Sequence, residues 1–325
     1  MTDGTEDQLL QILDRDAYRR LIRPRNSLAL THLGLRIGFH VGSLALATKL
    51  AADRHILTAL LVMTPHLAAW SFLGWAGLGH ELFHRNVFTS RSANGLLFKI
   101  CSVLTWNNYA FFEITHPIHH RNTLGPEDVE ANTKGHITPR QALGMFSFDL
   151  VGFIRRLRVL FMNATGRVPG GAKIQALIPE ESLDRRRVRD GARIVLLAQS
   201  ALVLVFVLAG APILIIGVTL APFLLSGFNR VLANLQHYGL SVGAPDTRYD
   251  QSSRTVRLGP VGSFFYANMN LHLAHHVWPG IPYYNLPEAD RLLTGAGRHL
   301  YETKGFWEGL TLLSQPVSLS SRPSR

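Results

Sequence analysis

Four long stretches of the chain are almost entirely apolar, and they set its predicted architecture. A helix that crosses a bilayer needs about 17–25 mainly apolar residues. The four stretches are therefore predicted spanning helices, the last two at the short end of that range; they cover roughly residues 28–50, 56–79, 194–209 and 213–228. Residues 51–55 and 210–212, which connect the members of each pair, are too few to form a domain. The pattern thus predicts two helical hairpins.

Positive charge is segregated to one side of these stretches. Residues 1–27 hold 5 Lys and Arg, residues 80–192 hold 15 and residues 229–325 hold 9, whereas the two short connections hold only Arg54. This asymmetry is the positive-inside pattern of membrane proteins. A net charge of +11 on a soluble chain would suggest nucleic acid as a partner, but the 47% hydrophobic and 17% charged composition favours the membrane and argues against nucleic acid.

We therefore expect an all-α integral membrane protein with one domain over residues 1–325. Four transmembrane helices in two hairpins would carry a helical cap on the cytosolic side, where both termini would also lie. Cys101 is the only cysteine, which excludes an intramolecular disulfide and fits a reducing cytosol. The expected segments are a cytosolic N-terminal segment, a first hairpin, a cytosolic or interfacial segment, a second hairpin and a cytosolic C-terminal segment, at residues 1–27, 28–79, 80–192, 193–228 and 229–325.

Nine of the fifteen histidines fall into four clusters. Helix positions i, i+3 and i+4 share one face, so each multi-histidine cluster presents its imidazoles in a common direction. Imidazole suits Fe, Zn, Cu and Ni, and nine imidazoles are too many for one ion. The clusters therefore predict two metal ions, with these candidate ligands: His80 and His84; His116, His119 and His120; His237; and His272, His275 and His276.

The predicted topology brings all four clusters to the basic side of the membrane. The first cluster ends the second apolar stretch, His237 follows the fourth, and the other two lie in the segments assigned to the cytosolic face. The remaining histidines are interpreted as ordinary structural residues: His32, His40, His55, His66, His136 and His299.

The first cluster also permits a different metal chemistry. His80-Glu81-Leu82-Phe83-His84 matches His-Glu-x-x-His, in which two histidines bind zinc and the glutamate is a general base. An intramembrane zinc protease is therefore a distant alternative, although it would leave seven clustered histidines unused. A histidine-rich metal transporter is another alternative, for which Arg36 and His40 in the first stretch are the only indication.

At these residues the chain resembles the membrane fatty acid desaturase and hydroxylase superfamily, whose histidine boxes bind two irons. The resemblance runs from the second apolar stretch to about Pro287. His116-Pro-Ile-His119-His120 and His272-Leu-Ala-His275-His276 are similar to boxes of the desaturase branch. His80-Glu-Leu-Phe-His84-Arg85 and His237-Tyr-Gly-Leu240 look like alkane monooxygenase motifs, with Gln236 where that branch has a glutamate.

The resemblance implies an O2-dependent non-haem di-iron enzyme that removes hydrogen from an unactivated C–H bond of a lipid-like substrate. Fatty acyl or lipid desaturation is the main expectation, and hydroxylation of an alkyl chain, fatty acid or carotenoid-like terpenoid is the alternative. Electrons would come from a separate ferredoxin- or rubredoxin-like carrier with its reductase, and membrane lipids would surround the chain. Polar residues expected near the metal ligands are Glu81, Glu113, Asp128, Asn234 and Asp250.

Overall fold

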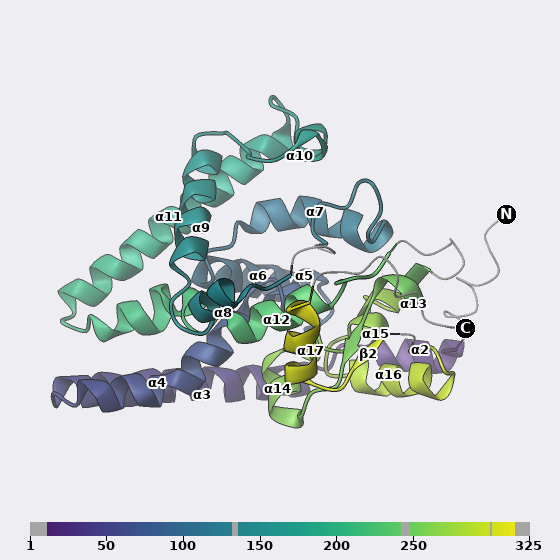
Figure 1. Cartoon of the computed structure of the whole chain (residues 1–325), viewed down its shortest axis with the longest axis horizontal. Coiled ribbons are helices and arrows are strands. Elements are labelled where there is room, and N and C mark those ends of the chain that lie inside the picture. The colour runs from purple at the N-terminus through teal and green to yellow at the C-terminus, as the bar shows by residue number, and fades with distance from the viewer. Residues whose placement is uncertain (1–11, 132–135, 242–247, 300, 316–325) are drawn as a thin grey trace. The chain divides into compact units, whose positions relative to one another are not determined.

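The computed structural model describes residues 12–131, 136–241, 248–299 and 301–315, most of which are helical. Contacts between Cα atoms divide the chain into two compact units, and Figure 1 labels the helices and strands that build them. Unit 1 comprises Met1–Pro24, Thr115–Ala142 and Arg230–Arg325, and unit 2 comprises Arg25–Ile114 and Leu143–Asn229. Each unit is thus built from segments that are distant in the sequence, and each is described separately below.

Unit 2 begins with a hairpin of two long helices, α3 (Asn26–Ala52) and α4 (Ile56–Trp70). Helix α3 ends in a Schellman motif, in which His55 N–H donates to Leu50 O at 2.8 Å and Arg54 N–H to Ala51 O at 3.1 Å. Arg54 takes the left-handed backbone conformation at φ 62°. The two helices pack closely through small side chains, because Ala47 and Ala59 are both fully buried. The predicted connection at residues 51–55 is confirmed as the point where the chain reverses.

The second apolar pair is only partly helical. Helix α11 (Leu183–Leu208) ends in another Schellman motif, with Gly210 at φ 66° and Ala211 N–H donating to Phe206 O at 3.0 Å. The stretch expected as a helix over residues 213–228 is divided into a π-turn, η2 (Ile215–Thr219), a short 3-10 turn, η3 (Ala221–Phe223), and the start of α12 (Gly227–Leu235). Two local features account for this division: Leu220 N–H bonds to Ile215 O in the wide i→i+5 pattern, and Pro222 has no N–H to extend a helix.

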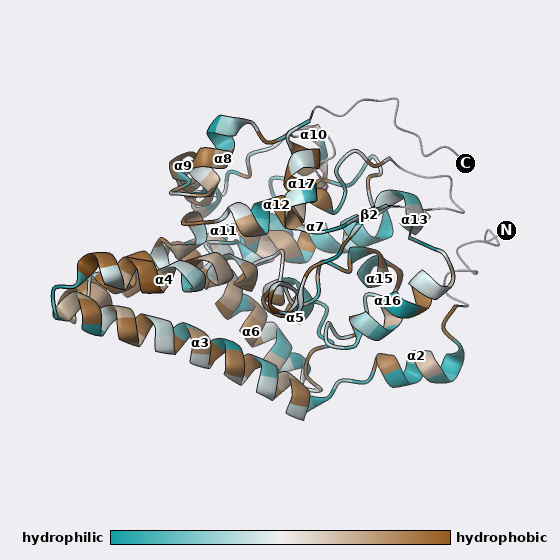
Figure 2. Cartoon of the chain, turned by 60° about the horizontal axis from the view of Figure 1, so that its bottom comes forward, coloured by the Kyte–Doolittle hydropathy of each residue, from teal (hydrophilic) through white to brown (hydrophobic). Residues whose placement is uncertain are grey.

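Among the described residues, two helical stretches are long and apolar enough to cross a membrane, Ile56–Phe83 and Leu183–Leu208. Helix α3 has the required length but not the required mean hydropathy. It nevertheless presents many apolar side chains outward, as do α4 and α11, and in Figure 2 much of α4 and parts of α3 carry the brown of hydrophobic residues. The exposed apolar residues include Leu30, Leu35, Ile37, Val41, Leu57, Leu61, Leu197 and Leu208. Such large exposed apolar surfaces are typical of contact with lipid or another apolar partner.

Shorter helices complete unit 2. They are η1 (Ser71–Leu73), α5 (Leu78–Phe83), α6 (Arg91–Leu104), α9 (Leu150–Ala164) and α10 (Ala172–Leu177). Helix α9 packs against α11 through Leu160 and Leu157, which meet Ala192 and Val195. Its opposite face exposes Val151 together with other apolar and basic residues. This amphipathic character fits a helix that lies along a membrane surface.

Unit 1 gathers helices from both ends of the chain and from its middle. Near the N-terminus is α2 (Arg15–Leu21), which packs beside α16 (Leu286–Gly295). Asn285 donates to Leu21 O at 2.7 Å, and Arg20 forms an exposed ion pair with Glu288 at 2.7 Å. The other helices of the C-terminal segment are α13 (Arg248–Ser252), α14 (Pro260–Phe265), α15 (His272–Val277) and α17 (Phe306–Leu313).

Two short strands in unit 1 depart from the all-α expectation. Strands β1 (Thr255–Val256) and β2 (Glu302–Thr303) pair in parallel, with Thr255 opposite Glu302. Arg257, directly after β1, donates to the Glu302 carboxylate at 2.8 Å and thereby ties the two segments together. At two residues each, the strands have no room for the alternating pattern from which strands are predicted.

Three of the described helices continue across the division between the units. They are α7 (Tyr109–Arg121), α8 (Pro139–Met145) and α12, which crosses it after Asn229. The prediction of a mostly helical chain is confirmed, whereas the prediction of a single domain over residues 1–325 stays a prediction.

Candidate metal centre

Helix α7 carries three of the clustered histidines on one face. His116, His119 and His120 occupy positions i, i+3 and i+4, and the rings of His116 and His120 lie 4.6 Å apart. His116 and His119 are almost completely buried. Pro117 lies inside the helix, where it lacks the N–H that would bond to the backbone one turn earlier. The local sequence therefore directs three imidazoles into the interior of the protein.

The short helix α15 carries three more. His272, His275 and His276 are each no more than 1% exposed. A tight turn before the helix, in which Ala267 and Asn268 both adopt φ 52°, is held by the Asn268 amide, which donates to Tyr283 O at 2.8 Å. The buried Trp278 ends the helix. These features fix the direction of α15 and of its histidines.

His237 lies two residues beyond α12 and is also buried. Its Nδ1 donates to the backbone carbonyl of Ser252 at 2.6 Å, at the end of α13. With the proton on Nδ1, the lone pair of the neutral ring is on Nε2. Nε2 points toward His272, whose own Nε2 is 3.0 Å away.

Four histidines of unit 1 form a compact group, named here set B. Their potential ligand nitrogens all lie within 4.8 Å of one another, and all four rings are buried: His119, His237, His272 and His276. His272 Nε2 lies 2.9 Å from His276 Nε2 as well as 3.0 Å from His237 Nε2. Three nitrogens from two separate segments thus meet around His272.

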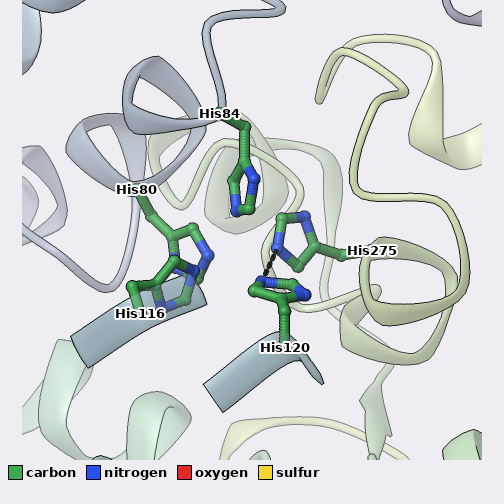
Figure 3. A group of neighbouring side chains, drawn as sticks. All are labelled: His80, His84, His116, His120 and His275. Atoms are coloured by element: carbon green, nitrogen blue, oxygen red, sulfur yellow. Dashed lines mark hydrogen bonds between the residues drawn. The ribbon is translucent and has the colours of Figure 1, made fainter. Parts of the chain in front are cut away.

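The other three clustered histidines of unit 1 form set A, which consists of His116, His120 and His275. Their ligand nitrogens also lie within 4.8 Å of one another, and the Nε2 atoms of His120 and His275 are 3.2 Å apart (Figure 3). Neighbouring histidines of each helix enter different sets, because His119 and His120 diverge on α7 and so do His275 and His276 on α15. Two helices thereby supply two metal-binding groups.

His80 and His84, also labelled in Figure 3, belong to unit 2, where they are carried by α5 and its C-cap. Their rings stack at a centroid distance of 5.2 Å. His80 donates from Nδ1 to Trp75 O at 3.0 Å and contacts Phe112 edge-on, so its Nε2 is the nitrogen that can bind a metal. The i, i+4 spacing places the two imidazoles on one face, as predicted.

The spacing of these nitrogens fits metal ligation. Two nitrogens bonded at about 2.1 Å to one ion, at right angles, lie about 3.0 Å apart. The Nε2 pairs of sets A and B are separated by 2.9, 3.0 and 3.2 Å. A single His272 Nε2, with one proton or one lone pair, cannot form good hydrogen bonds to both of its neighbours. A shared metal ion satisfies all three nitrogens.

Burial favours the neutral form of two set B imidazoles, and metal binding requires a neutral ring. Burial lowers the pKa of His237 to about 3, with the neighbouring His119 adding to the effect. Burial also lowers the pKa of His276 well below its ordinary value, and repulsion from His272 and His120 lowers it further. At neutral pH these rings therefore offer lone pairs.

Two carboxylates bond to α7 from the segment that follows it. Asp128 accepts from His119 Nδ1 at 2.9 Å, and Glu130 accepts from His116 Nδ1 at 2.8 Å. Burial would raise the pKa of Asp128, but hydrogen bonds from His119 and from two backbone N–H groups outweigh it and hold the pKa below its usual range. Burial raises the pKa of Glu130 to about 7. Sequence reasoning missed Glu130, although its separation of two residues from the candidate Asp128 was a usable signal.

The other polar candidates lie in different surroundings. Glu81 is fully buried on α5, next to His80. Glu113 forms an ion pair with Arg187 at 2.7 Å, and Asn234 is half-buried on α12. The side chain of Asp250 lies outside the described residues. A role near a metal stays a prediction for all of these residues.

The six histidines outside the clusters differ in environment. His40 and His66 are buried in unit 2, with Nδ1 atoms 3.1 Å apart, and His299 lies 3.1 Å from Asp290 in unit 1. None of these three belongs to set A or set B. His55 and His136 are exposed instead, and His32 is half-buried.

A mostly helical protein with two histidine groups suited to metal ions belongs to the class of histidine-box proteins. Residues 56–303 match the family described as fatty acid desaturase, and the chain therefore belongs to the fatty acid desaturase family. Among curated proteins, none matches the chain.

Family membership implies an oxidoreductase of the desaturase and hydroxylase kind, with a lipid substrate and an electron donor. The histidine groups and the family together point to iron as the metal. The family is membrane-associated, in agreement with the two apolar helical stretches. The distant interpretation of His80-Glu81-x-x-His84 as a zinc protease motif is not favoured, since it leaves sets A and B without a role.

Proposed function

We propose that this chain is an O2-dependent membrane enzyme that holds two iron ions and desaturates a fatty acyl or other lipid-like substrate. The observation that carries the proposal is the separation of the histidines of α7 and α15 into two groups, each with ligand nitrogens within 4.8 Å. Two groups on shared helices suit a pair of ions, whereas a single structural zinc needs only four ligands.

All nine clustered histidines are assigned as ligands. Set B (His119, His237, His272 and His276) would hold one iron. Set A (His116, His120 and His275) would hold the other, and the sequence pattern assigns His80 and His84 as further ligands. The iron pair would supply O2 activation and removal of hydrogen from an unactivated C–H bond. The protein would hold the imidazoles neutral and oriented, through the hydrogen bonds at Nδ1 of His80, His116, His119 and His237.

The topology we propose is multi-pass, with four spans in two hairpins and with both termini and the iron site in the cytosol. The Schellman turns after α3 and α11, and the outward apolar residues of α3, α4 and α11, support it. The segregation of Lys and Arg gives the orientation. The fourth span would consist of the π-turn η2, the turn η3 and the residues that lead into α12.

Electrons would come from a separate ferredoxin- or rubredoxin-like donor with its reductase. A single cysteine cannot hold an iron–sulfur cluster, so the chain needs an external source. The many Lys and Arg residues of the segments assigned to the cytosolic side suit an acidic carrier.

Hydroxylation is the second candidate. It is favoured by His80-Glu-Leu-Phe-His84-Arg85 and by His237-Tyr-Gly-Leu240, which are similar to alkane monooxygenase motifs. Both reactions begin with the same hydrogen removal, and they differ in whether the substrate then loses a second hydrogen or gains oxygen.

Product mass distinguishes the two reactions. Cells that produce the chain should accumulate lipids lighter by two hydrogens, whereas a gain of one oxygen would identify a hydroxylase. Purified protein should contain about two Fe per chain. Replacement His275→Ala should abolish the product, and the matched control His136→Ala, at an exposed histidine, should retain it. One zinc per chain, or an active His275→Ala variant, would contradict the proposal.

A further inference from the structure

One short segment of unit 1, Asp128–Glu130, supplies a carboxylate to each of the two histidine sets. Asp128 accepts from His119 of set B at 2.9 Å. Glu130, two residues later, accepts from His116 of set A at 2.8 Å. His116 and His119 are three positions apart on the same helix face, so a three-residue segment alongside α7 can reach both.

The segment is built to hold Asp128 in place. Its carboxylate also accepts from Leu124 N–H at 2.9 Å and from Glu130 N–H at 2.9 Å, which closes the turn after α7. Leu124 adopts φ 63° in this turn. The Asp128 side chain is only 2% exposed, so these hydrogen bonds are shielded from solvent. One carboxylate thus fixes both the loop and the ring of His119.

Glu130 is fixed by a different pair of groups. The Thr115 hydroxyl donates to one of its oxygens and His116 Nδ1 donates to the other. Thr115 is buried, and the Glu130 side chain is 20% exposed. Both of these hydrogen bonds therefore connect the Glu130 side chain to residues of α7, next to set A.

Each of these bonds determines how its histidine can bind a metal. A ring that donates its Nδ1 proton to a carboxylate keeps Nε2 for the metal, and the carboxylate makes that nitrogen more basic. The other oriented histidines, His80 and His237, donate instead to the uncharged carbonyls of Trp75 and Ser252. A site of neutral imidazoles leaves the charge of its ion uncompensated, so one nearby carboxylate per set matters.

We propose that Asp128 and Glu130 are positioning residues that divide the two iron ions between them, Asp128 acting on the ion of set B and Glu130 on the ion of set A. Each carboxylate accepts the Nδ1 proton of one imidazole and thereby orients that ring toward its own ion. The two ions can then be altered one at a time through two residues of the same loop. This inference rests on the proposed function, because it requires iron in both sets.

Mössbauer spectroscopy of the full-length protein loaded with 57Fe tests this division. Glu130→Gln and Asp128→Asn keep the size of each side chain and remove its charge. Each should weaken binding of one iron by about 10–100-fold and change the spectrum of that iron alone. The two variants should change different spectral components, and the double variant should change both. Glu127→Gln is the matched control, since Glu127 lies directly before Asp128 and forms an exposed ion pair with Arg121 at 3.8 Å.

The possible results lead to separate conclusions. Wild-type spectra in both variants, or a change in the same component from both, would overturn the division. Wild-type protein that takes up no iron would overturn the proposed function first, and the division with it. If Asp128→Asn protein fails to fold by circular dichroism, Glu130→Gln decides alone: one altered iron beside one unchanged iron supports the division, and any other pattern rejects it.

Discussion

The Nε2 atoms of His237 and His272 lie 3.0 Å apart, although the residues are separated by 35 positions in the chain. His272 Nε2 is equally close to His276 Nε2, at 2.9 Å. Three buried imidazole nitrogens at this spacing need a proton or a cation among them to offset the repulsion between their lone pairs. The stability of unit 1 should therefore depend on a metal ion.

We expect added Fe2+ to raise the melting temperature of the metal-free protein, because an ion that binds only the folded state stabilises it by mass action. A concentration of 100 times Kd adds about 2.7 kcal/mol. Differential scanning fluorimetry of the detergent-solubilised protein measures the shift. His272→Ala should reduce the shift strongly, while His136→Ala should keep it. An equal shift in both variants would show that the ion binds elsewhere.

Helix packing around His237 depends on a glycine of α17. A Cβ on Gly309 would approach Leu235 Cδ1 to 2.1 Å, and Leu235 is completely buried in α12, two residues before His237. Gly309→Ala should therefore destabilise the protein by about 1–3 kcal/mol, the usual cost of overpacking a core. Thermal unfolding and iron content should both decrease.

Gly262 in α14 provides the matched control. A Cβ at Gly262 would meet Leu258 Cβ at 3.6 Å, an ordinary contact. Gly262→Ala should be neutral or stabilising by up to about 1 kcal/mol, because alanine favours helix. If both alanine variants unfold at the same temperature as the wild type, α17 does not pack against α12 as described.

The sequence predicted these features unequally. The i, i+3, i+4 spacing correctly placed imidazoles on common faces of α7 and α15, and the apolar stretches correctly marked the turns at Arg54 and Gly210. The division of each helix between two sets was not predictable, because His119 and His120 differ only by a rotation about the helix axis. Glu130 was missed since it touches His116 only after the chain turns back along α7.

The interruption of the fourth apolar stretch was only partly visible in the sequence. Pro222 indicates a break in the helix, but the π-turn before it has no signal in the apolar pattern. The π-turn presents Gly217 O to His66 Nε2 at 2.7 Å, a contact between residues 151 positions apart. Only the packed unit reveals that His66 supplies this bond.

Loss of that bond should destabilise unit 2. His66→Leu leaves Gly217 O buried without its donor, which costs about 1–3 kcal/mol. Thermal unfolding in detergent measures the loss. Thr64→Ala is the control on the same helix, because Thr64 is exposed and bonds only within α4, to Leu60 O at 3.2 Å. Equal stability of both variants would contradict a structural role for His66.

The ion pair between Asp290 and Arg257 should give unit 1 a dependence on acidity. Burial would raise the pKa of Asp290, but hydrogen bonds from His299 and Arg257 outweigh it and lower the pKa. A carboxyl whose pKa is lowered in the folded state stabilises the protein at pH values above its unfolded pKa of about 4. This stabilisation is lost as the pH falls through the pKa of the folded state.

Asp290→Asn should therefore lower the melting temperature at pH 7 and have a smaller effect as the pH falls below about 4. The control Glu288→Gln, also on α16, removes an exposed ion pair with Arg20 and should change stability by no more than about 1 kcal/mol. Melting curves of the variants between pH 7 and pH 3 measure the difference. A constant effect of Asp290→Asn at every pH would exclude ionisation of Asp290 as the cause.

The single cysteine makes the proposed topology testable by chemical labelling. Burial shields Cys101 and raises its pKa to about 12, so a maleimide should leave it unmodified in the folded protein. His55 and His136 are both exposed and lie on opposite sides of the membrane in the proposed topology. In intact cells, a membrane-impermeant maleimide should label His55→Cys and not His136→Cys, whereas permeabilised cells should label both. Labelling of His136→Cys but not of His55→Cys in intact cells would show that the orientation is the opposite of the proposed one. Labelling of both variants in intact cells would show that no membrane separates the two positions.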